Sequence, residues 1–291
     1  MIPESPERQD LTSYSRFVLY GLVLPLLFIA GVQLFLLSEQ TETYFAWTFA
    51  APISAAFLGA GYWAAMIHAY TGARSRAWSF VRTSLPPALT ATGLLSITTF
   101  LHIDKFHLAS PLLLTRFVTW VWILVYIFVP PILAIAWIVQ SRQPGAHARG
   151  KDPLPVWMRA GFGLLAVFAL FSGLGLFLVP ERMAALWPWA VTPLAARAVS
   201  SWLSAFGVAC AALVLENDIR NGAGTSSSLC AFCILELVVI ARFASTIDWG
   251  KPMSIAYVLF LVLGVIVTGA NVAMNRTPPA PLGHPPQIRH R

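Results

Sequence analysis

The sequence predicts an all-α, polytopic transmembrane bundle of eight helices, arranged as two parallel four-helix repeats. Composition is the first observation that supports this fold class: 57% of the 291 residues are hydrophobic and only 11% are charged. A soluble domain has about a quarter of its residues charged. A soluble core of this length could not bury so much apolar surface, so the surrounding solvent is expected to be lipid.

Eight apolar segments are the second observation, because each is long enough to cross a hydrocarbon core of about 30 Å as a helix. None alternates with period two, as the strands of about 10 residues in a membrane barrel do. The weakest are the third, which is short and rich in threonine, and the seventh, which contains Glu236 and Arg242. The expected spans are residues 17–37, 50–70, 86–103, 117–139, 160–179, 194–215, 229–247 and 253–274.

Internal similarity is the third observation, since residues 20–47 match residues 162–189 at an offset of 142. Self-similarity of this kind indicates two related halves. Four spans per half return the chain to its starting side, so the repeats are expected to be parallel about an axis along the membrane normal. The identical pairs are Gly21/Gly163, Leu22/Leu164, Gly31/Gly173, Leu34/Leu176, Phe35/Phe177, Leu36/Leu178, Glu39/Glu181 and Trp47/Trp189, followed one residue out of register by Pro52/Pro193 and Ala55/Ala196.

The chain is expected to divide into five parts. They are a cytoplasmic segment (1–16), the first repeat (17–140), a cytoplasmic linker (141–159), the second repeat (160–276) and a disordered, Pro-rich cytoplasmic tail (277–291). With the N-terminus inside, 13 of the 19 Lys and Arg residues fall on the cytoplasmic side. This asymmetry predicts a multi-pass protein of the inner (cytoplasmic) membrane with both termini in the cytoplasm.

The net charge of +7 does not indicate a nucleic-acid partner, because the basic residues are spread thinly between apolar spans. The expected partners are the lipid bilayer and, alternatively, a second copy or another membrane protein. No phosphate-binding glycine loop or catalytic motif is found, and no cofactor is expected. Catalysis is therefore not the leading interpretation.

Four carboxylates are expected at the external ends of the spans. Glu39 and Glu181 are matched by the repeat, while Asp104 and Asp248 follow the similar tripeptide contexts His-Ile-Asp and Thr-Ile-Asp. One interpretation is a ring of charge that attracts cations to a mouth. The alternative is a set of solvated loop charges that pair with neighbouring Arg and Lys side chains.

Three ionisable residues lie deeper, namely Glu236, Arg242 and Arg197. An ionised group at the centre of a membrane costs about 2.5–3.5 kcal/mol or more, so each should face protein or water and find a partner. Glu236 cannot pair with Arg242 along one helix face, and it needs a partner on another helix or a proton. The interpretations are a substrate or ion site and a structural pair.

Trp47 and Trp189 occupy equivalent places before a proline, and are expected to anchor helix corners at the membrane interface. The alternative is a partly buried segment that lines an external vestibule. Small residues in the second and fifth spans are expected at close helix contacts.

Cys230 and Cys233 form a C-x-x-C pair near Cys210, and His68 is placed at a similar depth. These are soft ligands that could bind zinc or copper, or the thiols could form a redox pair. Packing is the preferred interpretation, because small cysteines are common between helices. His68 and His102 are expected at opposite membrane faces, which argues against haem.

The sequence thus predicts a protein that binds or transports a small solute or ion at a polar cavity between the repeats. One alternative is a non-catalytic scaffold or accessory subunit of a membrane complex. A second alternative is a membrane enzyme that uses thiols or a metal.

Overall fold

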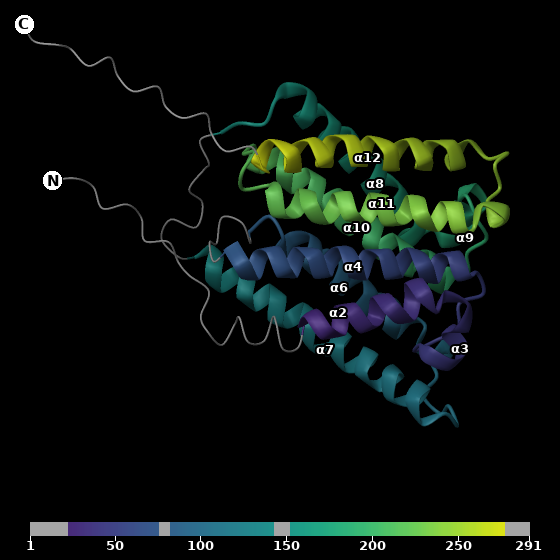
Figure 1. Ribbon diagram of the computed structural model, residues 1–291. Coiled ribbons are helices and arrows are strands. Elements are labelled where there is room, and N and C mark those ends of the chain that lie inside the picture. Colours follow the sequence, from purple (N-terminus) through teal and green to yellow (C-terminus); the bar gives the residue numbers. More distant parts are fainter. Residues whose placement is uncertain (1–22, 76–81, 143–151, 277–291) are drawn as a thin grey trace, which may run out of the picture.

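The computed structural model describes residues 23–75, 82–142 and 152–276, and these residues form helices and connections without any strand (Figure 1). The all-α prediction is therefore confirmed. The N-terminal segment, the tail and residues 143–151 of the linker lie outside the described residues. The long helices are α2 (Leu24–Gly31, continued by the π-helix Val32–Leu36), α4 (Pro52–Ser75), α6 (Leu85–Leu101), α7 (Leu113–Ser141), α8 (Val156–Leu178), α10 (Pro193–Glu216), α11 (Ala223–Arg242) and α12 (Pro252–Arg276).

Five of these helices, α7, α8, α10, α11 and α12, are long and apolar enough to cross a membrane. A sixth span is obtained if Leu24–Leu36 and Ser38–Tyr44, which are bent by 88°, count as one. The helix α6 is shorter, with 17 residues. The helix α4 has the length but a lower hydropathy, since it is rich in Ala and Gly and its first half is buried among other helices. By length and composition the described chain thus supports five or six spans rather than the expected eight.

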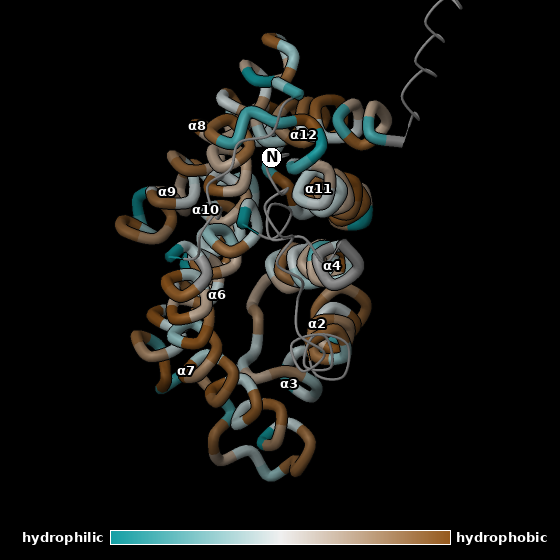
Figure 2. The backbone as a smooth tube through the Cα atoms, turned by 90° about the vertical axis from the view of Figure 1, so that its left-hand side faces the viewer, coloured by the Kyte–Doolittle hydropathy of each residue, from teal (hydrophilic) through white to brown (hydrophobic). Residues whose placement is uncertain are grey.

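The long helices form two layers (Figure 2). One layer has the order α7, α6, α10, α8, and the other has the order α2, α4, α11, α12. Contacts between α4 and α10 and between α8 and α12 join the layers. Each layer therefore contains two helices from residues 24–141 and two from residues 156–276, so the two halves of the chain interlock across a shared centre.

Prolines and small residues explain much of the local structure. Pro52, Pro193 and Pro252 begin helices, where the missing N–H of proline costs little. Glycines mark the closest helix crossings, as predicted. A Cβ atom at Gly173 would lie 2.8 Å from the backbone nitrogen of Ser204, and one at Gly59 would lie 2.4 Å from that of Phe35.

The two predicted tryptophan anchors are wrong in their placement. Trp47 and Trp189 are each only 2% exposed, so they are core residues rather than interface residues. The connections before α4 and α10 turn inward and carry these indoles into the bundle. Trp47 packs on Trp122 of α7, with ring centroids 4.9 Å apart, and Trp189 packs on Tyr257 of α12 at 5.9 Å.

Candidate functional site

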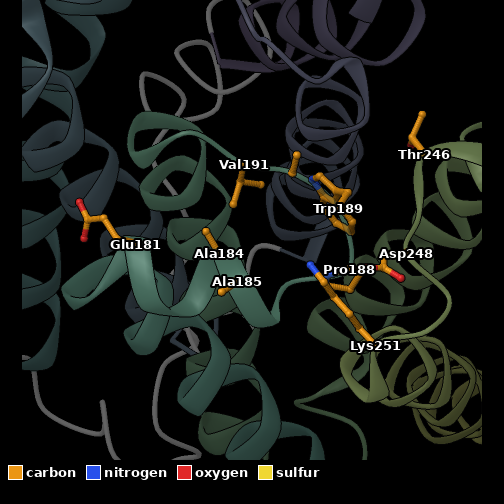
Figure 3. Close-up of a pocket in the computed structure, with 10 residues that line it drawn as sticks. Glu181, Ala184, Ala185, Pro188, Trp189, Val191, Thr246, Asp248 and Lys251 are labelled. Carbon is orange, nitrogen blue, oxygen red and sulfur yellow. The ribbon is translucent and has the colours of Figure 1, made fainter.

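An open depression of about 590 Å³ lies at the end of the bundle where α10 and α12 begin (Figure 3). It is bordered by the short helix α9 (Pro180–Leu186), by the connection from α9 to α10 and by the connection from α11 to α12. The lining residues are Glu181, Ala184, Ala185, Pro188, Trp189, Ala190, Val191, Thr246, Asp248 and Lys251.

Two of the four predicted mouth carboxylates, Glu181 and Asp248, border this depression. Glu39 instead lies 3.5 Å from Arg242, and the carboxylate of Asp104 lies 3.0 Å from Lys105. The hydrogen bond from Lys105 lowers the pKa of Asp104. The four carboxylates therefore do not all border one opening, and Glu39 and Asp104 have the nearby cations of the alternative interpretation.

Asp104 and Asp248 follow similar tripeptides, but they do not occupy equivalent places in the two halves. The 3₁₀ turns Ile103–Lys105 and Ala244–Thr246 follow α6 and α11 in the same way. After these turns, the backbone N–H of His107 donates to Ala46 O at 2.9 Å, and that of Asp248 donates to Pro188 O at 2.8 Å. His107, rather than Asp104, thus occupies the place of Asp248, because backbone pairing sets the register of these connections.

The floor of the depression is Trp189. Its indole N–H donates to Ser54 Oγ of α4 at 2.8 Å, and its ring contacts the ring of Tyr257. One side of Trp189 thus borders the depression while the other faces the interior of the second half. Beside it, Lys251 Nζ donates to the carbonyl oxygen of Trp187 at 2.8 Å.

Glu236 lies behind this floor, on the buried face of α11. Its side chain is completely buried, and Oε2 accepts a hydrogen bond of 3.0 Å from the hydroxyl of Tyr257. Its second oxygen, Oε1, has no hydrogen-bond partner. In the described part of the chain, no other carboxyl group has a buried oxygen left without a partner, and no ion pair includes Glu236. Such an atom is costly to leave unsatisfied in a helix bundle.

Six aromatic side chains, from four helices and from the connection that carries Trp189, form a closed ring of contacts in this region, called the aromatic circuit below. Tyr257, which donates to Glu236, is one member, and Phe232, four residues before Glu236 on α11, is another. The centroid separations are 6.3 Å for Phe57–Trp189, 5.9 Å for Trp189–Tyr257, 6.2 Å for Tyr257–Phe260, 5.0 Å for Phe260–Phe206, 5.6 Å for Phe206–Phe232 and 5.5 Å for Phe232–Phe57.

The two predicted arginines bind elsewhere. Arg242 Nη1 donates to Phe35 O at 2.6 Å, and Arg197 Nε donates to Phe177 O at 3.2 Å. Both acceptors belong to the last turn of a helix, where carbonyl groups lack intrahelical donors and a cation is favoured by the helix dipole. The structure therefore gives Arg197 and Arg242 a capping contact each, and no hydrogen bond joins them to Glu236.

Arg197 also meets a histidine from the other half of the chain. Its Nη1 lies 2.8 Å from Nε2 of His102, just after α6. Burial, together with the positive charge of Arg197, lowers the pKa of His102. The neutral imidazole can accept this hydrogen bond, whereas the protonated ring cannot.

The soft-ligand hypothesis gains no support from the geometry. All three cysteines are free, with Cys210 and Cys233 buried and Cys230 half-buried. Within residues 23–75, 82–142 and 152–276, no group of three or more His, Cys, Asp or Glu side chains is placed to hold a metal ion, so His68 joins no such set. Cys233 instead packs closely against α12, because a Cβ atom added at Gly264 would lie only 2.4 Å from its Sγ.

Tyr257 and Ser54 were not identified from the sequence. Tyr257 stands in an apolar span where its hydroxyl needs a partner, and that need is a signal that could have linked it to Glu236. Ser54 offered no comparable signal, because its role depends on an indole that arrives from the other half of the chain.

Taken together, the helices and this interior site define an α-helical, multi-pass membrane protein with a buried carboxyl group behind an aromatic floor. Comparison of the chain with protein-family models, with curated proteins and with solved structures gave no match.

Proposed function

We propose that the protein binds a small solute or ion at Glu236 and exchanges it with the depression in front of Trp189. The observation that carries this proposal is the buried Oε1 atom without a partner. An ionisable side chain inside a membrane bundle is expensive, and proteins retain such groups mainly where a ligand, an ion or a proton uses them. Binding would supply the missing partner, so the free energy lost in burying Glu236 is recovered when the ligand is present.

The location of the depression supports access from one side of the membrane. Glu181, Asp248 and Thr246 give it a polar rim, and Trp189, which also lines it, packs on Tyr257, the hydrogen-bond partner of Glu236. In the proposed topology both termini are cytoplasmic, in the inner membrane, and the depression faces outward. Solute transport, as opposed to binding, would need a second route from Glu236 toward the cytoplasm.

We further propose that the bundle is an internally duplicated set of eight spans, with repeats 17–140 and 160–276. The helix pairing supports this, because exchanging the two halves relates three pairs of contacts: α2 with α4 and α8 with α10, α6 with α7 and α11 with α12, α4 with α11 and α10 with α6. The contact of α8 with α12 has no comparable counterpart between α2 and α7 in the described residues. Equivalent crossings also recur, with Trp63 of α4 over Gly31 and Ser204 of α10 over Gly173.

A solute panel tests the binding proposal on the purified full-length protein in detergent. The thermal unfolding midpoint is measured with small cations, anions and neutral solutes at matched ionic strength. We expect at least one class to raise the midpoint of the wild type and to leave Glu236→Gln unchanged, because ligand binding stabilises only the competent folded state. The matched control is Asp104→Asn, an exposed carboxylate outside the depression.

The proposal is contradicted if no class of solute gives a shift that depends on Glu236. The control variant guards against a general charge effect, since Asp104→Asn removes the same charge from the same end of the bundle and should respond as the wild type does.

A scaffold role is the second candidate, favoured by the exposure of α7. Only 17% of its most apolar 18-residue stretch is buried, against 39% of the corresponding stretch of α12. A helix with so apolar a surface faces either lipid or another membrane protein. Light scattering in mild detergent would support the scaffold if the mass exceeds one chain and returns to one chain on replacing exposed Leu124 and Phe128 by alanine. A single-chain mass for both proteins would reject association of copies through α7.

A further inference from the structure

We propose that the ligand of the interior site is a small ammonium-type cation, such as a short primary amine, and that Trp189 is the barrier it must pass. This inference rests on the proposed function and specifies its ligand class. Three features carry it: a buried carboxyl group with one oxygen left without a partner, the aromatic side chain of Tyr257 that joins this group to the circuit, and the position of Trp189 between the circuit and the depression.

The carboxyl group selects for positive charge. An anion would be repelled by Glu236, and a neutral solute would leave a carboxylate isolated in an apolar bundle. A cation with N–H donors could instead donate to Oε1, which is free, while Tyr257 continues to donate to Oε2. Hydrogen bonds between an ammonium group and a carboxylate are short and stronger than neutral ones, and the bound pair is neutral overall.

The aromatic circuit selects among cations. Metal cations such as Ca²⁺ and Mg²⁺ require about six oxygen ligands, but the carboxyl group of Glu236 has one hydrogen-bond partner, the hydroxyl of Tyr257. The face of an aromatic ring attracts an ammonium ion, and this attraction is strongest where water is excluded. The ring of Tyr257, together with that of Phe232 one turn before Glu236 on α11, therefore suits an organic ammonium better than a metal ion.

Trp189 is the member of the circuit that controls access. It lines the depression and packs on Tyr257, the hydrogen-bond partner of Glu236, so the direct way from the depression to Glu236 leads past this indole. A single hydrogen bond to Ser54 Oγ of α4 holds its N–H. Ser54 is thus a positioning residue: removing its hydroxyl should release the indole and speed exchange, with little change in the affinity set by Glu236.

Calorimetric titration of the purified full-length protein with methylammonium chloride tests the ligand class. We expect saturable binding that weakens roughly tenfold or more in Glu236→Gln, because a charged hydrogen-bond acceptor is lost. Tyr257→Phe should weaken binding less, since it removes a neighbour of the carboxylate rather than the charge. Glu236→Asp keeps the charge and should retain weakened binding, which separates ligand loss from a folding defect.

Sodium chloride, acetamide and sodium acetate are the matched probes. Binding of sodium or acetamide that depends on Glu236, with none for methylammonium, would overturn the ligand class while leaving the binding function intact. Binding of none of the probes, together with a flat solute panel, would overturn both. A titration seen only as proton uptake, unaffected by the amine, would identify the ligand as a proton and also reject this inference.

Stopped-flow tryptophan fluorescence tests the barrier. Ser54→Ala should accelerate methylammonium binding and release severalfold and equally, so that the equilibrium affinity changes little. Unchanged rates in Ser54→Ala would reject Trp189 as the barrier. The matched control is Ser228→Ala, which removes another buried hydroxyl, one that donates to Ala64 O at 2.7 Å.

Discussion

The two halves of the bundle bury a hydrogen bond between their last two helices in contrasting ways. In residues 24–141, the indole of Trp122 on α7 donates to the hydroxyl of Thr99 on α6 at 3.0 Å. In residues 156–276, the hydroxyl of Tyr257 on α12 donates to the carboxyl group of Glu236 on α11. The first pair satisfies its indole donor, whereas the second leaves one carboxyl oxygen without a partner. The two pairs thus differ in whether every buried polar atom has a partner, and the proposed binding site lies at the pair that leaves one without.

The two halves also differ in how far their last helices are enclosed by other helices. The last helix of the second half, α12, packs on α11 and also back on α8. In the first half α7 packs on α6 and on the short helix α3 (Thr41–Tyr44), and much of its surface is exposed (Figure 2). The second half therefore shields its last helix, which carries Tyr257, more fully than the first half shields α7.

The largest expected effect comes from disrupting the crossing of α8 and α10 in the second half. Gly173→Ala should destabilise the protein by about 2–3 kcal/mol, because the new Cβ meets the backbone of Ser204, which cannot move alone. Gly31→Ala should cost about 1 kcal/mol, since it meets only the side chain of Trp63. Reversible denaturation in detergent measures both.

Gly93→Ala is the matched control for these crossings, because nothing lies within 4 Å of its added Cβ. It should be neutral or slightly stabilising, as alanine favours helix more than glycine does. Equal losses of stability for Gly31→Ala and Gly173→Ala would show that the two crossings are equally rigid, which would contradict the difference between the two halves.

Substitutions in the two buried pairs should have an intermediate effect on stability, which is stabilising in the second half and destabilising in the first. They test whether each pair serves packing or binding. The double variant Glu236→Met, Tyr257→Phe should stabilise the protein by about 1 kcal/mol, because replacing a buried polar pair by apolar groups removes an unsatisfied atom. Thr99→Val should destabilise it by about 1 kcal/mol, since the indole of Trp122 loses its acceptor. Denaturation midpoints test the signs, and destabilisation by the double variant would indicate that Glu236 serves packing.

The smallest expected effect is a pH dependence of stability that arises at His102, whose hydrogen bond with Arg197 joins the two halves. The pKa of His102 is lowered in the folded protein, so the folded state binds fewer protons than the unfolded state there. This contribution to stability is complete above about pH 6.5, the ordinary histidine pKa, and is lost as the pH falls through the folded value. Asp104 opposes the shift, and Lys105 reinforces it.

Thermal unfolding between pH 7.5 and pH 5 measures this link. His102→Gln keeps a hydrogen-bond acceptor for Arg197 but does not titrate, so its midpoint should fall less over this range than that of the wild type. Parallel curves for the two proteins would exclude His102 as the group responsible.

Much of the fold follows from local sequence patterns. Long apolar runs predicted helices at all eight expected places, since a chain in lipid must satisfy its backbone hydrogen bonds internally. Proline and glycine predicted helix starts and close crossings, because both act through local backbone geometry. The depth of Glu236 also followed from its position in a span, and its burial is confirmed.

What the sequence by itself determined is how far along the bundle each residue lies, because depth depends only on the count of residues from a helix end. Only the tertiary structure decided which side chains meet at that depth: Tyr257 with Glu236, Ser54 with Trp189, and the two arginines with helix ends. These contacts join helices far apart in the chain. Their rotation about their own axes is set by packing against neighbours, and no local pattern records it.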